Sequence, residues 1–281
     1  MFSICSFCHR ISIVFLLYGR RIATHSVDPS LTHFLGESAP GPDKIKLREL
    51  RRVPAPLLAA YYNFWLVAEH TPAELSHGET IHVLVHKGGE PENPANFRPI
   101  TMTSRVTRVL HKVLAARLTG AALLDPRQKA FVPVDGCADN TFLLDTIIRG
   151  AQRRRKPVCL TFLDVAKAFD CVSHQTQRRS LLRLGVPSPL VQYVSRMYEN
   201  TTTVLRVGGS RTDPIRCNRS VRQRDPLSSF LFNAVNDEVI SKLCPAMGYY
   251  LNENVMVQCL GFCDDLILVT STADGMREQV E

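Results

Sequence analysis

The sequence predicts an α+β fold in which an antiparallel sheet packs on helices. Apolar residues recur at helical spacing in several segments, and alternating or continuous apolar runs typical of strands lie between them. Two segments have the pattern of β-hairpins. Because these elements follow one another without a regular βαβ rhythm, separate helical and antiparallel layers are favoured over a parallel sheet.

The composition is that of a globular protein with a basic balance. Of the 281 residues, 45% are hydrophobic and 21% are charged, so the chain can bury a sizeable core. The net charge of +8 mildly favours a polyanionic partner, although a basic surface that only maintains solubility explains it equally well. The nine cysteines lack the spacing of a disulfide scaffold, which favours reduced thiols in an intracellular protein.

Residues 1–37 are expected to be a poorly ordered leader. The apolar run at 11–19 is shorter than the roughly 20 residues that span a bilayer, so no membrane span is expected. Cys5 and Cys8-His9 resemble half of a zinc or haem site, but no second pair of ligands follows nearby.

The first half of the chain is expected to be mostly helical. Pro54 and Pro56 divide its first helical segment into a short and a longer helix. The expected elements are a loop at 28–44, the divided helical segment at 47–67, a strand at 80–87, a turn-rich stretch at 88–99, and helices at 105–118 and 137–149.

The second half mixes strands and helices. Gly208-Gly209 marks the turn of one hairpin, and Cys263 to Asp265 form the turn of the other. The expected elements are a strand at 157–165, helices at 175–184 and 189–198, a hairpin at 203–217, a long helix at 227–243 and a hairpin at 255–270.

Three aspartates stand in apolar strand segments, where carboxylates are costly to bury. Asp264 and Asp265 interrupt the second hairpin, and Asp164 ends the strand at 157–165. Two strands that each carry an acid at one end can gather three carboxylates at a sheet edge, where they repel one another unless cations neutralise them. A pair of Mg²⁺ ions held in this way serves phosphoryl transfer. A polar hairpin turn is the alternative for Asp264-Asp265 alone.

Three segments in order, TFLDVAKAFDCVSH, SVRQRDPLSSFLFNAV and GFCDDLILV, resemble successive palm motifs of reverse transcriptases, which are RNA-directed DNA polymerases. Upstream, VLVHKGGEPENPANFRPITMTSRVTRVLHKVLAARL resembles the fingers motifs, and SAPGPDKIKLRELRRVPAPLLAAYYNFWL the extra motif of non-LTR retrotransposons. The sequences of these motifs are most similar to those of the elements that insert into ribosomal RNA genes.

The resemblance implies the fingers and palm of a right-hand polymerase, with the antiparallel palm sheet packed on helices. The implied parts are fingers at 38–157 and a palm at 158–281 with an insertion at about 171–219, the reverse transcriptase domain itself covering roughly 80–281. The chain ends at Glu281, soon after Asp265, so we expect no thumb within it.

The resemblance also implies nucleotidyl transfer with two Mg²⁺ ions, Mn²⁺ being an alternative. Asp164 and Asp264 would hold both metals, the carbonyl of Val165 would add a ligand, and Asp265 would support the pair. One metal would lower the pKa of the primer 3′-hydroxyl, and the other would stabilise the leaving pyrophosphate. The implied partners are an RNA template, a DNA primer and a deoxynucleoside triphosphate (dNTP), and the implied place of action is the nucleus.

Four residues match positions of the family that contact the nucleotide. Lys87 and Arg98 match the basic pair that grips the triphosphate, for which solvated loop charge is the alternative. Phe169 matches the ring that packs under the sugar and selects against a 2′-hydroxyl, and Gln223 matches a residue that contacts the incoming nucleotide. A core ring and a surface turn residue are their alternatives. The basic residues that could line a template channel are Arg105, Arg108, Lys112, Arg117 and the run at 153–156.

The chain departs from the family pattern at three positions. Ser220 and Arg224 stand where the family has glycine, and Cys263 stands where it has alanine. Glycine is used where φ is positive or where the backbone closely approaches a ligand. A degenerate, non-catalytic remnant that at most binds nucleic acid is therefore one rival to an active enzyme. An RNA-templated RNA polymerase with the same palm is another, against which Phe169 argues.

Overall fold

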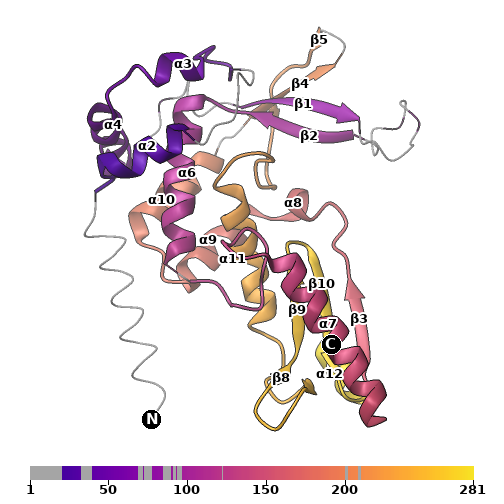
Figure 1. Cartoon of the computed structure of the whole chain (residues 1–281). Helices are drawn as coiled ribbons and strands as arrows, with labels where there is room; N and C mark the ends of the chain where they lie inside the picture. The colour runs from indigo at the N-terminus through magenta and orange to yellow at the C-terminus, as the bar shows by residue number, and fades with distance from the viewer. Residues whose placement is uncertain are drawn as a thin grey trace. The chain divides into compact units, whose positions relative to one another are not determined.

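The computed structural model has the expected mixed α+β architecture (Figure 1). Two compact units divide it: unit 1 comprises Met1–Ala121 and Phe169–Leu231, and unit 2 comprises Ala122–Ala168 and Phe232–Glu281. The residues that the structure describes are 21–32, 40–68, 72, 78–84, 90, 93, 97–121, 123–199, 202–207 and 210–281.

Unit 1 has a helical part in which α6 (Arg105–Gly120) is largely buried. Ser104 begins this helix, and its side chain accepts a hydrogen bond from the Val106 amide at 3.1 Å. Tyr62 donates its hydroxyl to the Val106 carbonyl at 2.9 Å, which joins α4 to α6. The other helices of this part are α2 (Thr24–Thr32), α3 (Leu47–Leu50), α4 (Ala55–Ala68), α9 (His174–Arg183) and α10 (Ser188–Tyr198).

A mixed sheet belongs to the same unit. Its strand order is β2-β1-β4-β5, with β6 paired to β4. Strand β1 runs antiparallel to β2 and parallel to β4, while β5 and β6 pair antiparallel with β4. The strands are β1 (Gly78–Leu84), β2 (Phe97–Met102), β4 (Thr202–Val207), β5 (Ser210–Arg211) and β6 (Ile215–Arg216).

Unit 2 is built on an antiparallel sheet with the strand order β3-β10-β9. The central strand β10 pairs Leu266 with Leu163 on one side and with Gly261 on the other. The strands are β3 (Cys159–Leu163), β9 (Cys259–Phe262) and β10 (Asp265–Thr270), and a short separate pair is formed by β7 (Tyr249–Tyr250) and β8 (Met256–Val257).

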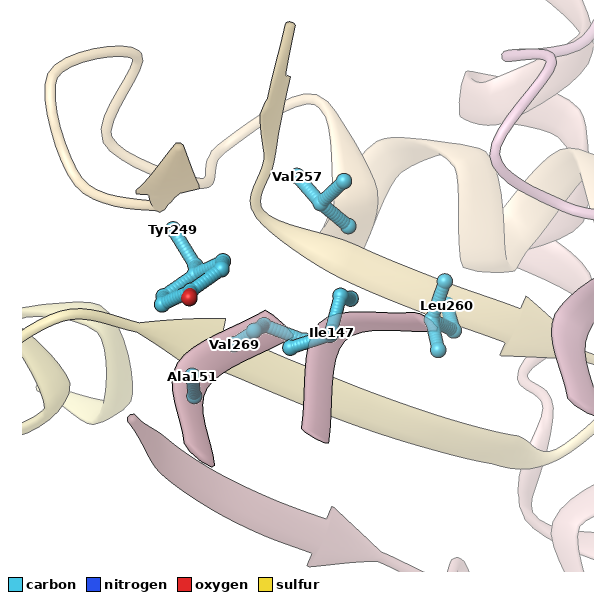
Figure 2. Close-up of a cluster of buried hydrophobic side chains, with 6 residues drawn as sticks. All are labelled: Ile147, Ala151, Tyr249, Val257, Leu260 and Val269. Carbon is cyan, nitrogen blue, oxygen red and sulfur yellow. The ribbon is translucent and has the colours of Figure 1, made fainter. Parts of the chain in front are cut away.

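Alternating side chains of this sheet enter two different cores. The first core joins the sheet to α7 (Gly136–Arg154) and consists of Ile147, Ala151, Tyr249, Val257, Leu260 and Val269 (Figure 2). The second core joins the sheet to the end of α11 (Ser228–Ile240) and to α12 (Ala273–Val280), and consists of Ile240, Cys259, Leu268 and Met276. The strands are thus held rigidly from both faces.

The structure corrects the expected elements at the N-terminal side. Residues 24–32 form α2, whereas the sequence predicts a leader followed by a loop at 28–44. The helix forms because Val27 and Leu31, one turn apart, are both buried. Residues 1–20, with the Cys5 and Cys8-His9 pattern, lie outside the described residues.

Other differences concern short or polar elements. Strand β2 begins inside the stretch predicted to be turns, and neither α8 (Ala168–Cys171) nor α12 is predicted. Helix α7 extends beyond its predicted end to Arg154. Within the described part of the chain, no helix has the length and apolar character needed to cross a membrane. The boundary between fingers and palm near residue 157 stays a prediction.

Candidate active site

The three predicted metal-binding aspartates lie at one end of the unit 2 sheet. Asp164 follows Leu163, the last residue of β3, and Asp265 is the first residue of β10. Because Leu163 pairs with Leu266, the antiparallel register sets Asp164 opposite Asp265. Asp264 lies beside Asp265 in the turn that joins β9 to β10.

This end of the sheet offers the chemistry that a hard divalent cation needs. Asp164 and Asp265 are exposed and Asp264 is partly exposed, so ions can reach all three carboxylates. A cation would relieve the repulsion between their charges. Among the described side chains, however, no group of three His, Cys, Asp or Glu residues is close enough to hold a metal ion. The donor set and the register fit a metal, while the side chains do not form a finished site.

Val165, the predicted backbone ligand, directly follows Asp164. Its carbonyl accepts a hydrogen bond from the Ala168 amide at 3.1 Å. A carbonyl oxygen has two lone pairs, so this bond leaves one for an ion. The turn therefore fixes the direction of the Val165 carbonyl without using up its capacity.

The turn before Asp265 consists of two residues, Cys263 and Asp264, since Phe262 pairs with Asp265. Cys263 is the turn residue with a positive φ, 57°, which is the pattern of a type II′ hairpin turn. Burial raises the pKa of the Cys263 thiol to about 12, together with a hydrogen bond to Asp264 and the charges of both aspartates. The thiol is therefore neutral at pH 7 and adds no charge to the acidic group.

Unit 1 brings together two of the predicted nucleotide-binding residues. Phe169, in α8, accepts a hydrogen bond on its carbonyl from the Val221 amide at 2.9 Å. Gln223 donates to the carboxylate of Asp170, the neighbour of Phe169, at 3.2 Å. Gln223 and Asp170 line a cavity of about 250 Å³. Asp170 is thereby the hydrogen-bond partner of Gln223 at the edge of this cavity.

The predicted triphosphate-binding pair consists of Lys87 and Arg98. Lys87 lies outside the described residues. The backbone of Arg98 pairs with Val83 in the ladder of β1 and β2. Their contact with a triphosphate stays a prediction.

Ser220 and Arg224, which stand where the family has glycine, both have backbone angles typical of glycine. Ser220 has a φ of 101° and Arg224 a φ of 70°. L-residues seldom adopt such angles because the Cβ atom crowds the backbone, whereas glycine adopts them freely. The Arg224 side chain is exposed. At both positions the family's glycine would therefore suit the local conformation better than the residue present.

A buried polar chain holds the residue after Arg224. Asp225 accepts hydrogen bonds from His111 at 2.6 Å and from the Leu227 amide at 2.9 Å, and the other nitrogen of His111 lies 2.9 Å from the Tyr193 hydroxyl. Burial alone would raise the pKa of Asp225, but the attraction and hydrogen bond of His111 outweigh it and hold that pKa below its usual value. The sequence signals this chain only by a single histidine in the amphipathic helix at 105–118.

The basic residues of α6 fit a template channel only in part. Arg105 is 1% exposed, so the prediction that it lines an open channel is wrong: its side chain is part of the interior of unit 1. Arg108 and Lys112 are half-buried, and burial lowers the pKa of each. The run at 153–156 is exposed. Burial follows from tertiary packing, which the spacing of basic residues does not reveal.

The family model described as reverse transcriptase (RNA-dependent DNA polymerase) matches residues 85–281. The chain belongs to the reverse transcriptase family.

Within that family it resembles the Pol polyproteins of R2 retrotransposable elements. It is 40% identical over 235 residues to the Retrovirus-related Pol polyprotein from type-1 retrotransposable element R2 of Popillia japonica, and the match covers 83% of this chain and 32% of that protein. It is 35% identical over 240 residues to the polyprotein from type-2 retrotransposable element R2DM of Drosophila melanogaster, covering 85% and 22%. The chain thus spans a third or less of the length of these relatives.

Solved structures of telomerase have a similar fold. The apo telomerase from Candida tropicalis matches with a TM-score of 0.50 and 11% identity, over 74% of this chain and 41% of that chain. The telomerase from Candida albicans in complex with a fragment of telomeric RNA matches with a TM-score of 0.50 and 13% identity, over 81% and 43%. At such identities the likeness shows a polymerase-like fold alone.

Proposed function

We propose that the chain supplies the fingers and palm of an R2-type reverse transcriptase, which adds deoxynucleotides to a DNA primer on an RNA template. The observation that carries the proposal is the register of β3 and β10, in which Asp164 lies opposite Asp265 with Asp264 in the adjoining turn. The family match over residues 85–281 supports the same chemistry.

Each residue of the acidic group has a role in this proposal. Asp164 and Asp264 would hold two divalent ions, the carbonyl of Val165 would add a ligand, and Asp265 would support the pair. Bound there, the ions would lower the pKa of the primer 3′-hydroxyl and stabilise the leaving pyrophosphate. The flanking strands suit the task because a packed sheet positions ligands better than a free loop does.

The nucleotide would be contacted by residues of unit 1. Gln223 would be presented by its hydrogen bond to Asp170 at 3.2 Å. Phe169, whose carbonyl is tied to the Val221 amide at 2.9 Å, would hold a ring under the sugar and exclude a 2′-hydroxyl. The net charge of +8 suits the phosphates of template, primer and dNTP. Action in the nucleus stays a prediction.

The test is primer extension on an RNA template in Mg²⁺, with the wild type and with Arg224→Gly. We expect incorporation of dNTPs, a lower rate with ribonucleotides, and a higher rate for Arg224→Gly because glycine removes a long side chain and suits the positive φ. Absence of extension by both proteins would refute the enzymatic proposal. Ribonucleotides used as well as dNTPs would favour the RNA polymerase alternative.

A non-catalytic remnant that binds nucleic acid is the second candidate. It is favoured by the same two positions, Ser220 and Arg224, whose φ values of 101° and 70° are those of glycine. Under this candidate the wild type binds an RNA–DNA duplex but does not extend the primer. Extension by Arg224→Gly alone would identify a decayed enzyme whose acidic site is still intact.

A further inference from the structure

A short segment before α7 lies along the outer edge of β9. The Gly261 amide donates to the Arg127 carbonyl at 3.1 Å, and the Lys129 amide donates to the Gly261 carbonyl at 2.9 Å, so Gln128 and Gly261 form a parallel bridge. A Cβ at Gly261 would lie 3.3 Å from the Arg127 carbonyl oxygen, a tight contact that glycine avoids. Gln128 is thereby held beside the strand that leads into the Cys263–Asp264 turn.

The Gln128 side chain is hydrogen-bonded to both peptide groups of Cys263. Its Oε1 accepts from the Cys263 amide at 2.9 Å, and its Nε2 donates to the Cys263 carbonyl at 3.1 Å. Asn236 of α11 donates to the same carbonyl at 2.6 Å. Because these two peptide groups flank the Cys263 Cα, the three bonds restrain both its φ and its ψ. Gln128 is 3% exposed, so water has little access to them.

Cys263 depends on outside support for its conformation. Its φ of 57° is unfavourable for an L-residue, and such angles persist where the surroundings impose them. A glutamine amide carries a donor and an acceptor on one rigid plane, which matches the carbonyl and amide of a single residue. The side chain and the strained turn therefore fit each other chemically.

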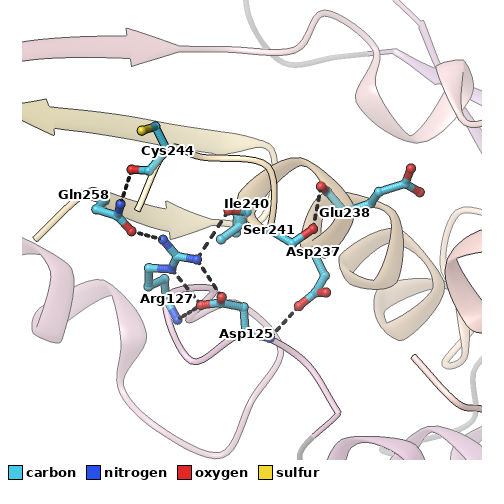
Figure 3. A network of polar contacts seen from close by, with 8 residues as sticks. All are labelled: Asp125, Arg127, Asp237, Glu238, Ile240, Ser241, Cys244 and Gln258. Atoms are coloured by element: carbon cyan, nitrogen blue, oxygen red, sulfur yellow. Dashed lines mark hydrogen bonds and ion pairs between the residues drawn. The ribbon is translucent and has the colours of Figure 1, made fainter. Parts of the chain in front are cut away.

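Arg127, the neighbour of Gln128 in sequence, anchors the same segment through its guanidinium (Figure 3). Its guanidinium donates to the Asp125 carboxylate at 2.9 and 2.7 Å, to Gln258 Oε1 at 2.6 Å and to the Ile240 carbonyl at 3.3 Å. The Asp125 amide in turn donates to Asp237. The backbone that presents Gln128 is thus tied to α11 and to the residue before β9, and cannot shift with the turn.

We propose that Gln128 is a positioning residue for Asp264 and Asp265. By holding Cys263 in its left-handed conformation, it sets the direction in which the chain leaves β9 and enters β10, and so the place from which both carboxylates project. This inference rests on the proposed function, because the positions of the two carboxylates matter only if they bind metal ions.

The test compares Gln128→Met with Gln279→Met in the full chain. Both changes replace a glutamine whose side-chain amide bonds to backbone groups of unit 2. Gln279 accepts from the Cys244 amide at 3.1 Å and donates to the Met247 carbonyl at 2.9 Å, and it bonds to neither the turn nor Arg127. The first readout is amide hydrogen exchange in peptides that cover the β9–β10 turn. The second is Mn²⁺ affinity measured by electron paramagnetic resonance, with Asp264→Asn as the reference for loss of the acidic site.

We expect faster exchange at Cys263 and Asp264 in Gln128→Met and an Mn²⁺ affinity about 10- to 100-fold weaker, the usual effect of losing a group that orients metal ligands. Gln279→Met should keep the wild-type affinity. Gln128→Asn keeps a neutral amide in this buried site but is one methylene too short to reach both Cys263 groups, so it should fold and show the same losses in smaller degree. It therefore serves if the methionine variant is unstable.

The outcomes separate the inference from the proposed function. Wild-type Mn²⁺ affinity in both Gln128 variants, or an equal loss in Gln279→Met, would overturn the positioning role. A wild type that binds Mn²⁺ no better than Asp264→Asn would instead refute the proposed function. In that case, hydrogen exchange still tests whether Gln128 restrains Cys263. Unchanged exchange at the turn in Gln128→Met would refute this restraint, and faster exchange would support it.

Discussion

Replacing Ser220 and Arg224 by glycine is predicted to stabilise the chain. Their φ values are 101° and 70°, and hydrogen bonds keep Ser220 in place: its amide donates to the Val172 carbonyl at 2.7 Å and its carbonyl accepts from Gln177 at 3.1 Å. The backbone therefore cannot relax to a negative φ without losing these bonds. Since the Arg224 side chain is exposed, its removal sacrifices little packing.

The expected gain in the free energy of unfolding follows from the backbone angles. At Arg224 the left-handed conformation costs about 1–2 kcal/mol, and glycine returns about 0.5–1 kcal/mol as unfolded-state entropy, which leaves a net gain of about 0.5–1 kcal/mol. Ser220 lies beyond the left-handed well, where strain is about 1–3 kcal/mol, so its net gain is about 0.5–2 kcal/mol. Together they should add about 2 kcal/mol, which raises the Tm by about 4–8 °C in a chain of this size.

Thermal unfolding followed by calorimetry measures this gain in the two single variants and the double variant. Arg216→Gly is the matched control, because Arg216 is an exposed strand residue without a positive φ. There glycine brings only its entropic cost, and the Tm should fall. A Tm that falls in Arg224→Gly or Ser220→Gly as it does in Arg216→Gly would refute the reasoning from backbone strain.

Two further predictions concern stability away from the acidic residues. The folded-state pKa of Asp225 is lowered, so its contribution to the free energy of unfolding is fully present above the ordinary aspartate pKa of about 4 and is lost as the pH falls through the folded-state value. Asp225→Asn should therefore cost about 1.5–3 kcal/mol at neutral pH, because it replaces the charged partner of buried His111 by a neutral amide while the Tyr193 hydroxyl stays as the other partner. It should also flatten the pH dependence below about pH 4 in chemical denaturation, and an unchanged acid limb would contradict this. Gly136→Ala should lower the Tm because its Cβ would overlap the Lys129 carbonyl. Gly120→Ala has open space around the new methyl, so it should leave the free energy of unfolding unchanged or raise it by up to about 0.5–1 kcal/mol. Equal Tm changes in the two alanine variants would show that the overlap is relieved without cost.

The frame of the candidate site was predictable because its signals are local. The apolar run that becomes β3, the hairpin of β9 and β10 and the position of each aspartate follow from residues that are neighbours in sequence. The glycine-like backbone of Ser220 and Arg224 was predictable from the motif they interrupt. In each case a few adjacent residues determine the geometry.

The supporting contacts were not predictable because they join distant segments. Gln128 meets Cys263, and His111 meets Asp225, across more than a hundred residues. Neither pair has a periodic or spacing signal, and the parallel pairing of β1 with β4 has none either. Helix α2 was missed for a related reason, since its burial depends on partners in α4 and α6 rather than on its own polar sequence.

The most direct test of the proposed two-metal chemistry is the primer-extension rate of Asp164→Asn in the Arg224→Gly background. Asp274→Asn is the control, because Asp274 is a 90% exposed carboxylate of the same unit, paired with Arg277 in α12. We expect Asp164→Asn to lose about a thousandfold or more, equivalent to about 4 kcal/mol of transition-state stabilisation, and Asp274→Asn to keep its rate. An Asp164→Asn variant that extends the primer as fast as Asp274→Asn would contradict the assignment of the acidic sheet end as the catalytic centre.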